Sequence, residues 1–162
     1  MNIIRIDESF KSAAAPLIAE FRAALNSYRG IASRPSLEEA GAEYLWLLEK
    51  GYPVFAAEEN GELLGYAVCR VEDGIVWVEQ LYTREAARRR GVGTLLFEKA
   101  EELARSMGES TVYNYIHPNN DGVIAFLRSR GYTVLNLIEV RKPYEGEKPR
   151  LTVRVNEHSF DY

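Results

Sequence analysis

Cysteine, histidine and long hydrophobic runs are scarce in this chain, which has one cysteine and two histidines among 162 residues. A single cysteine excludes an internal disulfide framework, and Cys69 lies within an apolar run, which is typical of a buried core residue in a reducing compartment. No His, Cys or carboxylate cluster has metal-ligand spacing, so we expect no metal. The N-terminus MNIIRIDESF becomes charged after four residues, so we expect no signal peptide, no membrane span and a cytoplasmic location.

An excess of positive charge is also missing. The 20 lysines and arginines are outnumbered by 24 aspartates and glutamates, which gives a formal net charge of −4. Binding to nucleic acid would need a basic stripe, so we expect no nucleic-acid partner, and any anion site must be local. Apolar residues make up 46% of the chain, enough to bury the core of a single compact domain spanning residues 1–162.

Periodicity and turn signals divide the first half of the chain into strands and helices. A short β-type run at residues 2–6 precedes an apolar stripe that predicts a helix over residues 10–28, which either starts near Pro16 or is kinked there. A Ser-x-x-Glu capping box predicts a second helix over residues 36–51. An Asn-Gly and an Asp-Gly turn separate three antiparallel strands within residues 54–83.

The second half of the chain alternates helices and strands. A predicted helix over residues 94–108 leads to a strand at 110–116, which we expect to lie parallel to the strand before the helix. A helix over residues 119–131 and a long strand over 132–142 follow, and residues 151–155 are a candidate hairpin partner for that strand. This order predicts a mixed sheet with helices on its faces, an α/β or α+β fold.

Three arginines stand where a helix disfavours positive charge. Helix N-termini present unpaired N–H groups and a partial positive charge, so acidic residues are favoured there. Arg88, Arg89 and Arg90 nevertheless precede the predicted helix start. Gly91 and Gly93 have no side chain to block a ligand and can adopt positive φ, so successive N–H groups can surround an oxyanion. The combination predicts a site for phosphate or pyrophosphate, and the alternative is a solvated, arginine-rich helix start.

Two common phosphate motifs do not fit this segment. A Walker loop needs lysine after its last glycine, but Thr94 follows Gly93, and a dinucleotide fingerprint needs glycine where Leu96 stands. What fits is R-x-x-G-x-G at Arg88, Gly91 and Gly93, between a strand and an amphipathic helix. With the order of elements around it, this motif resembles the acyl-CoA-binding signature of the GNAT superfamily of N-acyltransferases, and the resemblance spans nearly the whole chain.

The resemblance implies a fold and a cofactor. It implies a mixed, mostly antiparallel central sheet of about six to seven strands with helices on both faces, and acetyl-CoA as co-substrate. Backbone N–H groups of the signature would hold the CoA pyrophosphate, and the pantetheine arm would hydrogen-bond the preceding strand where it splays from its parallel neighbour. Asn120, or alternatively Asn119, would contact the cofactor or simply cap a helix. The cofactor-binding residues implied in this way are Leu81, Tyr82, Thr83, Arg88, Arg89, Arg90, Gly91, Val92, Gly93, Thr94 and Asn120.

Acetyl transfer to an amine requires a group that accepts the amine's proton, directly or through water. Glu79 is the candidate base, because the family frequently places a glutamate near this point and strand alternation would put Trp77, Glu79 and Leu81 on one face. The alternative is an ordinary surface glutamate at a strand end. A backbone N–H near Leu81 would stabilise the thioester carbonyl oxygen.

The general acid has no obvious candidate. Many family members carry a tyrosine at the position that Leu127 occupies here, which excludes general-acid catalysis by that residue. An unassisted thiolate, a different tyrosine or no catalysis remain. Tyr115, Tyr132 and His117 lie close in sequence to the predicted site, and none is in register with the usual acid.

The resemblance implies an acetyl-CoA-dependent N-acetyltransferase, in which a primary amine of a small molecule or peptide attacks directly in a ternary complex. The acceptor would lie between the first two helices, the loop GIASRPS and the terminal hairpin. Two alternatives remain open. One is a non-catalytic acyl-CoA sensor, and the other is an interaction protein whose terminal strand pairs with a partner, including another copy in a homodimer.

Overall fold

The computed structural model describes residues 1–33, 36–149 and 151–162. The chain forms two compact units, residues 1–125 and residues 126–162. The first contains a five-stranded sheet in the order β1-β2-β3-β4-β5, and the second contains a two-stranded sheet of β6 and β7. The strands are β1 Asn2–Arg5, β2 Val54–Glu59, β3 Glu62–Glu72, β4 Ile75–Thr83, β5 Tyr113–Asn114, β6 Thr152–Val155 and β7 His158–Asp161.

The helices begin within two residues of the predicted starts, except that the alternative start of the first helix near Pro16 is wrong. Ser36 caps the second helix, because its hydroxyl accepts a hydrogen bond from the Glu39 N–H at 3.2 Å, so the predicted capping box is confirmed on the serine side. Pro16 lies inside the first helix, so the helix starts well before it. The helices are α1 Lys11–Tyr28, α2 Leu37–Glu49, α3 Val92–Ser106 and α4 Asp121–Ser129, with short 3-10 turns at Glu8–Phe10 and Glu85–Ala87. None of these helices is long and apolar enough to cross a membrane, as far as the described residues go.

Two tight turns fold β2, β3 and β4 into the predicted antiparallel meander. Asn60 and Gly61 have φ of 54° and 83°, and Asp73 and Gly74 have φ of 51° and 81°. Positive φ at both central residues is the geometry whose twist suits a two-residue hairpin. The pairs β1–β2, β2–β3 and β3–β4 are antiparallel, and β4–β5 is parallel as predicted.

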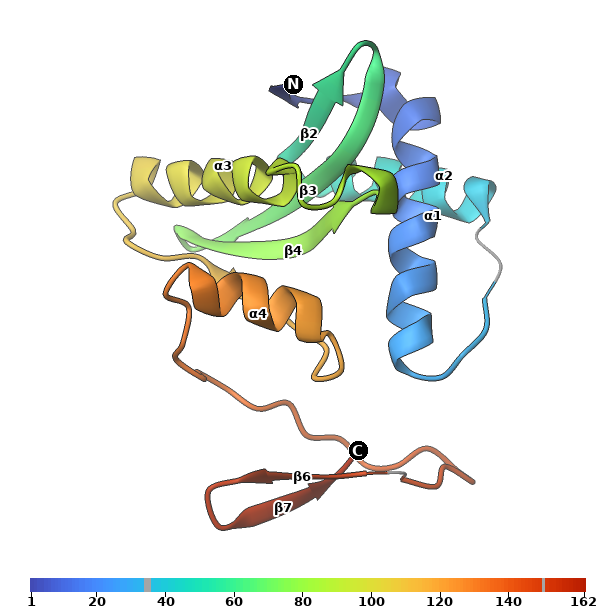
Figure 1. The fold of residues 1–162 in the computed structure, drawn as a ribbon, viewed down its shortest axis with the longest axis vertical. Coiled ribbons are helices and arrows are strands. Elements are labelled where there is room, and N and C mark those ends of the chain that lie inside the picture. Colours follow the sequence, from blue (N-terminus) through green and yellow to red (C-terminus); the bar gives the residue numbers. More distant parts are fainter. Residues whose placement is uncertain (34–35, 150) are drawn as a thin grey trace. The chain divides into compact units, whose positions relative to one another are not determined.

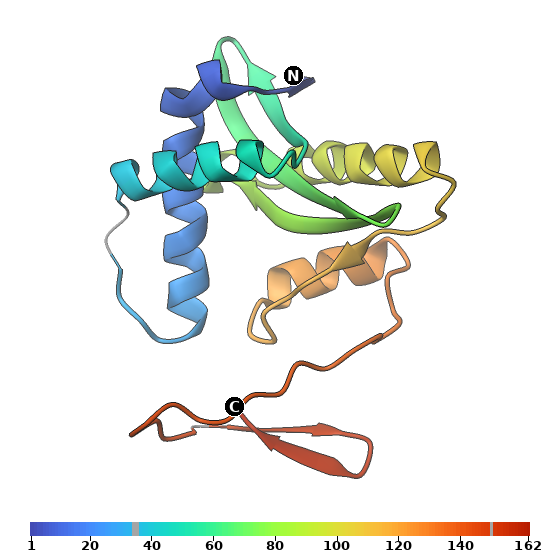
Figure 2. The ribbon, with the colours of Figure 1, turned by 180° about the vertical axis from the view of Figure 1, so that it is seen from behind.

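Helices cover both faces of the five-stranded sheet. In Figure 1, α3 lies in front of the strands, and in Figure 2, which shows the opposite side, α2 lies in front of them and crosses α1. Each face has its own buried cluster, which confirms the mixed fold with helices on both faces. The cluster beneath α1 and α2 includes Leu17, Tyr44 and Val68, and the cluster beneath α3 includes Ala67, Val92 and Leu96.

The C-terminal strand pairing differs from the prediction. Residues 132–142 form no strand, and β6 pairs with β7, in a register where Val155 is opposite His158. Pairing across a two-residue turn closes a very short loop, whereas pairing with residues 132–142 would close a longer one. The predicted long strand is therefore wrong, and the main sheet has five strands where about six to seven were expected.

Candidate active site

The helix α3 begins without a capping side chain. Its N-cap is Gly91, with φ of 84°, and its first turn contains no acidic residue. The first helical hydrogen bond runs from the Leu95 N–H to the Gly91 carbonyl at 3.0 Å. Within the described chain, the backbone N–H groups of residues 89–94 donate to no other protein group. A series of unsatisfied donors at a positive helix end favours binding of an anion.

The loop in front of α3 leaves room for such an anion. A Cβ atom added to Gly91 would meet nothing within 4 Å, and one added to Gly93 would meet only Thr83 Oγ1 at 3.6 Å. Arg89 also has a left-handed backbone, with φ of 63°, which is uncommon for a residue with a side chain. Left-handed residues at 89 and 91 curl the chain, and such curls make concave sets of N–H groups that suit a phosphate.

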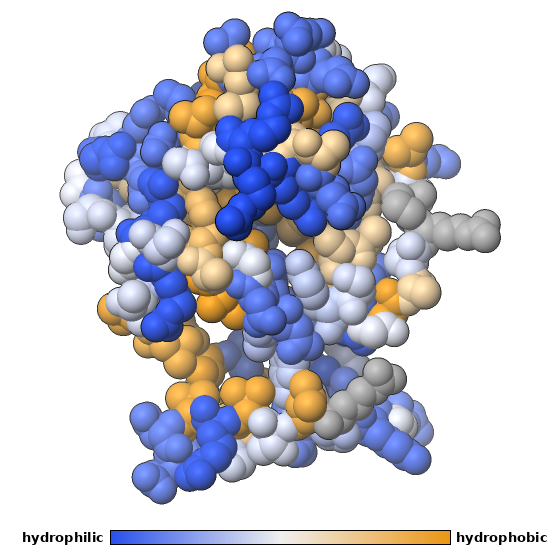
Figure 3. All heavy atoms as spheres, in the orientation of Figure 1, coloured by the Kyte–Doolittle hydropathy of each residue, from blue (hydrophilic) through white to orange (hydrophobic). Residues whose placement is uncertain are grey.

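The three arginines are not equivalent. The Arg90 Nη2 atom is 2.5 Å from Glu59 Oε2. The hydrogen bond that Arg90 donates is the main reason why the pKa of Glu59 is lowered. The Arg88 Nε donates to the Thr83 carbonyl at 3.2 Å. Among the described residues, Arg89 has neither an ion pair nor a side-chain hydrogen bond, so an anion can recruit it without breaking a contact. Figure 3 shows strongly hydrophilic side chains over this loop.

The strand before the loop has a free edge. β5 pairs with β4 only at Trp77 and Val78, although β4 continues to Thr83. The Arg84 N–H donates to a β3 carbonyl at 2.9 Å. Because antiparallel residues alternate in their hydrogen bonding, the backbone groups of Leu81 and Thr83 point away from β3, toward the side where β5 has ended. An extended ligand can pair with these groups as an added strand would.

A β-bulge interrupts β4 beside this edge. Val68 is opposite Gln80, but the next pair joins Cys69 to Val78, so Glu79 is an extra residue without a cross-strand partner. An extra residue inverts the alternation of side chains on one side of the bulge relative to the other.

The bulge corrects one sequence-based expectation. Trp77 and Glu79 share a face, because Arg70 contacts both side chains. Leu81 packs instead with the cluster beneath α3, on the opposite face. The expectation that Trp77, Glu79 and Leu81 lie together is therefore wrong for Leu81. The Glu79 side chain is 35% exposed, and its Oε2 accepts from Arg70 Nε at 3.1 Å.

Gln80 connects the bulge to both N-terminal helices. This glutamine is 5% exposed, and its Oε1 accepts from the Tyr66 hydroxyl at 2.7 Å. Its Nε2 donates to Glu43 of α2 at 2.6 Å, and Glu43 also accepts two hydrogen bonds from Arg22 of α1, at 2.8 and 2.6 Å. The network satisfies a buried amide and fixes the two helices against the bulge.

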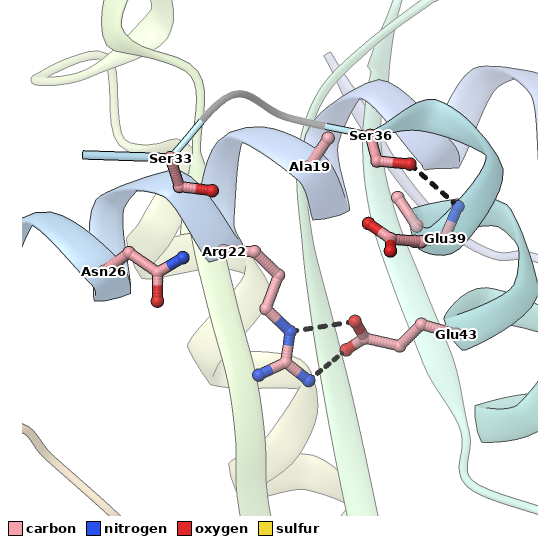
Figure 4. A pocket seen from close by; sticks show the side chains of 8 residues that line it. Ala19, Arg22, Asn26, Ser33, Ser36, Glu39 and Glu43 are labelled. Carbon is pink, nitrogen blue, oxygen red and sulfur yellow. Dashed lines mark hydrogen bonds and ion pairs between the residues drawn. The ribbon is translucent and has the colours of Figure 1, made fainter. Parts of the chain in front are cut away.

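A pocket lies at the outer end of this network, between α1 and α2. Its volume is about 260 Å³, and Figure 4 shows the Arg22–Glu43 pair within it. The hydrogen bond to Glu43 raises the pKa of Arg22 against the opposing effect of burial, and the charge of Glu79 acts in the same direction as Glu43. In the predicted acceptor loop, Arg34 and Pro35 lie outside the described residues. The pocket is lined by Ala19, Arg22, Asn26, Ser33, Ser36, Glu39, Ala40 and Glu43.

Asn120 caps α4 and faces the end of α1. Its Oδ1 accepts from the Val123 N–H and from the Tyr28 hydroxyl, both at 3.2 Å. The helix-cap alternative is therefore correct. A cofactor contact is compatible with it, because the Asn120 Nδ2 donates to no other group in the described part of the chain. Asn119 instead donates from Nδ2 to the Tyr28 carbonyl at 3.0 Å.

The comparisons with known proteins show the family of this chain. The family model described as "Acetyltransferase (GNAT) family" matches residues 18–132. The chain belongs to the GNAT family of acetyltransferases. An uncharacterized N-acetyltransferase of Methanocaldococcus jannaschii is 30% identical over 103 residues, 55% of this chain and 43% of that protein. The L-methionine sulfoximine/L-methionine sulfone acetyltransferase of Salmonella typhimurium is 33% identical over 89 residues, 52% of each protein. The chain thus spans about half the length of the curated relatives it matches.

A solved GNAT structure shares the fold. AAC(6')-Iy, in complex with the bisubstrate analogue CoA-S-monomethyl-acetylneamine, aligns with a TM-score of 0.68 at 16% identity, over 88% of this chain and 98% of that chain. Among the described residues of our GNAT chain, no group of three or more His, Cys, Asp or Glu side chains is arranged to hold a metal ion.

The candidates for the acid of this GNAT protein have different surroundings. Tyr115 is 62% exposed, and its ring stacks on Trp77 at 4.9 Å between ring centres. The His117 ring stacks on Tyr28, and burial, with a smaller effect of the Arg29 charge, lowers the pKa of His117.

Leu127 takes no part in proton transfer, because its side chain is a hydrocarbon and is 3% exposed. Tyr132 belongs to the second unit, where its N–H donates to the Leu127 carbonyl at 3.0 Å.

Sequence reasoning missed four polar residues around the predicted base and its bulge, namely Arg22, Glu43, Arg70 and Gln80. Gln80 carried a signal, because it is a polar residue within the apolar strand IVWVEQL. The other three carried none, because helix and strand surfaces are normally charged and only the bulge brings these side chains toward Glu79 and Gln80.

Proposed function

We propose that this GNAT protein transfers an acetyl group from acetyl-CoA to a primary amine, by direct attack of the amine in a ternary complex. The observation that carries the proposal is the start of α3, where backbone N–H groups of residues 89–94 have no partner among the described residues and Gly91 leaves the approach open. These donors fit the CoA pyrophosphate. The backbone edge at Leu81 and Thr83, which β5 does not reach, fits its pantetheine arm once the Arg88 side chain releases the Thr83 carbonyl.

Each residue of the site then has a role. Acetyl-CoA, when bound, supplies the thioester carbonyl that the amine attacks. The Leu81 N–H lies on the free edge of β4 and is suited to donate to the carbonyl oxygen. Glu79 accepts the amine's proton, directly or through water. Arg88, Arg89 and Arg90 surround the phosphates, Tyr82, Val92, Gly93 and Thr94 complete the strand edge and the helix start, and the Asn120 Nδ2 contacts the cofactor.

The acceptor is a small-molecule or peptide amine. We place it in the pocket between α1 and α2, because Glu43 and Arg22 join this pocket to the bulge that carries Glu79. The Salmonella relative acts on L-methionine sulfoximine and L-methionine sulfone, and the AAC(6')-Iy complex holds an acetylneamine analogue, so both support a small amine. A cytoplasmic location and a homodimer stay predictions.

Release of free CoA thiol, measured over a panel of amines, tests the proposal. Glu79→Gln keeps the size of the side chain but cannot accept the proton, so we expect turnover to fall about 100-fold or more while acetyl-CoA binding is retained. Glu102→Gln is the matched control, since it also neutralises a glutamate that is paired to a cation, on the surface of α3. Binding of acetyl-CoA without release of thiol for any amine would favour the alternative of a non-catalytic sensor. Unchanged turnover by Glu79→Gln would show that Glu79 is not the base.

A further inference from the structure

Arg70 joins the predicted base to an aromatic wall. Its side chain, near the end of β3, is 18% exposed. The Nε atom donates to Glu79 Oε2 at 3.1 Å, and Nη1 donates to Glu72 Oε2 at 2.7 Å. The guanidinium carbon lies 5.1 Å from the centre of the Trp77 ring and 5.8 Å from that of Tyr115. Two hydrogen bonds and two nearby aromatic rings together restrain the position of the guanidinium.

The bulge brings Glu79 to this guanidinium. Arg70 is directly opposite Trp77, and the extra residue in β4 leaves Glu79 without a cross-strand neighbour of its own. Within the described residues, Arg70 is the only hydrogen-bond partner of the Glu79 carboxylate, and it engages Oε2. Oε1 is thereby left to a substrate or water molecule.

The other nearby charges are already engaged. Arg22 gives two hydrogen bonds to Glu43, at 2.8 and 2.6 Å, so its guanidinium is engaged in a bidentate pair with that carboxylate. Glu72 contacts Arg70 and not Glu79. Arg70 is thus the cation that fixes the orientation of the Glu79 side chain.

We propose that Arg70 is a positioning residue for acetyl transfer, which anchors Glu79 Oε2 so that Oε1 faces the amine. This inference rests on the proposed function, in which Glu79 is the base. As the new N–C bond forms and the thioester C–S bond breaks, the amine proton moves to Oε1 and the sulfur leaves with its electron pair. Arg70 keeps all its protons, because a guanidinium does not release them near neutral pH.

A double-mutant cycle on kcat tests this inference. Arg70→Gln removes the anchor, and we expect kcat to fall about tenfold or more, because small displacements of a catalytic group are costly, while KM for acetyl-CoA stays unchanged. In a Glu79→Gln background the same substitution should have no further effect. Lys99→Gln is the matched control, since it removes one positive charge from a surface pair with Glu102 on α3 and should leave kcat unchanged.

A conservative substitution and a chemical rescue separate position from charge. Arg70→Lys keeps the charge but lacks the planar fork, so we expect it to stay impaired. Guanidinium ion, added at concentrations that do not unfold the protein, should restore part of the kcat of Arg70→Ala by filling the place beside Trp77 and Tyr115. Thermal unfolding identifies a variant that fails to fold, in which case the cycle uses Arg70→Lys.

The outcomes distinguish this inference from the proposed function. If Glu79→Gln is impaired and Arg70→Gln lowers kcat by the same factor with or without Glu79, Arg70 has only a structural role and the inference is overturned. If Glu79→Gln turns over like the wild type, the base assignment fails first, and the role of Arg70 falls with it.

Discussion

Substitution of Gly91 by alanine tests the proposed anion site most directly. Gly91 has φ of 84°, and an added Cβ would meet nothing within 4 Å, so the substitution causes backbone strain without a steric clash. A left-handed residue with a Cβ costs about 1 to 2 kcal/mol. For a protein of this size that lowers Tm by about 2 to 8 °C.

The effect on cofactor binding is separate from the effect on stability. Strain at Gly91 turns the neighbouring N–H groups, and each hydrogen bond to a charged group contributes about 1.5 to 3 kcal/mol. Loss of one such bond raises Kd for CoA about tenfold to 100-fold. Isothermal titration calorimetry with CoA measures this value, and scanning calorimetry measures Tm.

Gly108 provides the matched control at the other end of α3. It has φ of 86°, and an added Cβ would again meet nothing within 4 Å. Gly108→Ala should therefore lose a similar amount of stability but bind CoA like the wild type. If both variants bound CoA equally well, the loop before α3 would not be the diphosphate site, and the reasoning from its unpaired donors would be refuted.

Two further predictions concern the buried polar groups. Tyr66→Phe removes the 2.7 Å hydrogen bond to Gln80 Oε1 and leaves a buried acceptor unpaired. We expect the free energy of unfolding, measured with urea, to fall by about 1 to 3 kcal/mol. An unchanged urea midpoint would contradict this expectation. Burial raises the pKa of Cys69 to about 12 and, with a smaller contribution from the Asp7 charge, the pKa of Tyr44 to about 12. Both pKa values are higher in the folded protein than in the unfolded one, so the two groups stabilise the fold fully at pH values below their unfolded pKa values. This stabilisation is lost as the pH rises toward 12. Cys69→Ala should make the alkaline loss shallower when unfolding is measured against pH, and an equally steep loss would count against the thiol.

Local signals predicted the elements that position the proposed cofactor site. The capping serine of α2, the Asn-Gly and Asp-Gly hairpins and the parallel strand after α3 all follow the sequence, because caps and tight turns depend on a few neighbouring residues. The family motif could also be read from a few neighbouring residues, since the role it implies depends on backbone N–H groups and on two glycines without side chains.

The C-terminal region shows the limit of such reasoning. Residues 132–142 have the composition of a strand, yet a strand exists only where a partner supplies hydrogen bonds, and residues 158–161 compete successfully for β6. Strand propensity measures fit to a sheet and does not choose the partner.

By itself, the sequence determined that a helix start with two glycines, for which we propose anion binding, follows a strand meander, and that a glutamate lies near the end of that strand. Only the tertiary structure decided what surrounds this glutamate. One extra residue in β4 places Glu79 beside Arg70 and sends Leu81 to the opposite face. The physical reason is that successive side chains of a strand point to opposite faces of the sheet. A single extra residue therefore reverses the faces of all the side chains that follow, and no local sequence pattern reveals that residue.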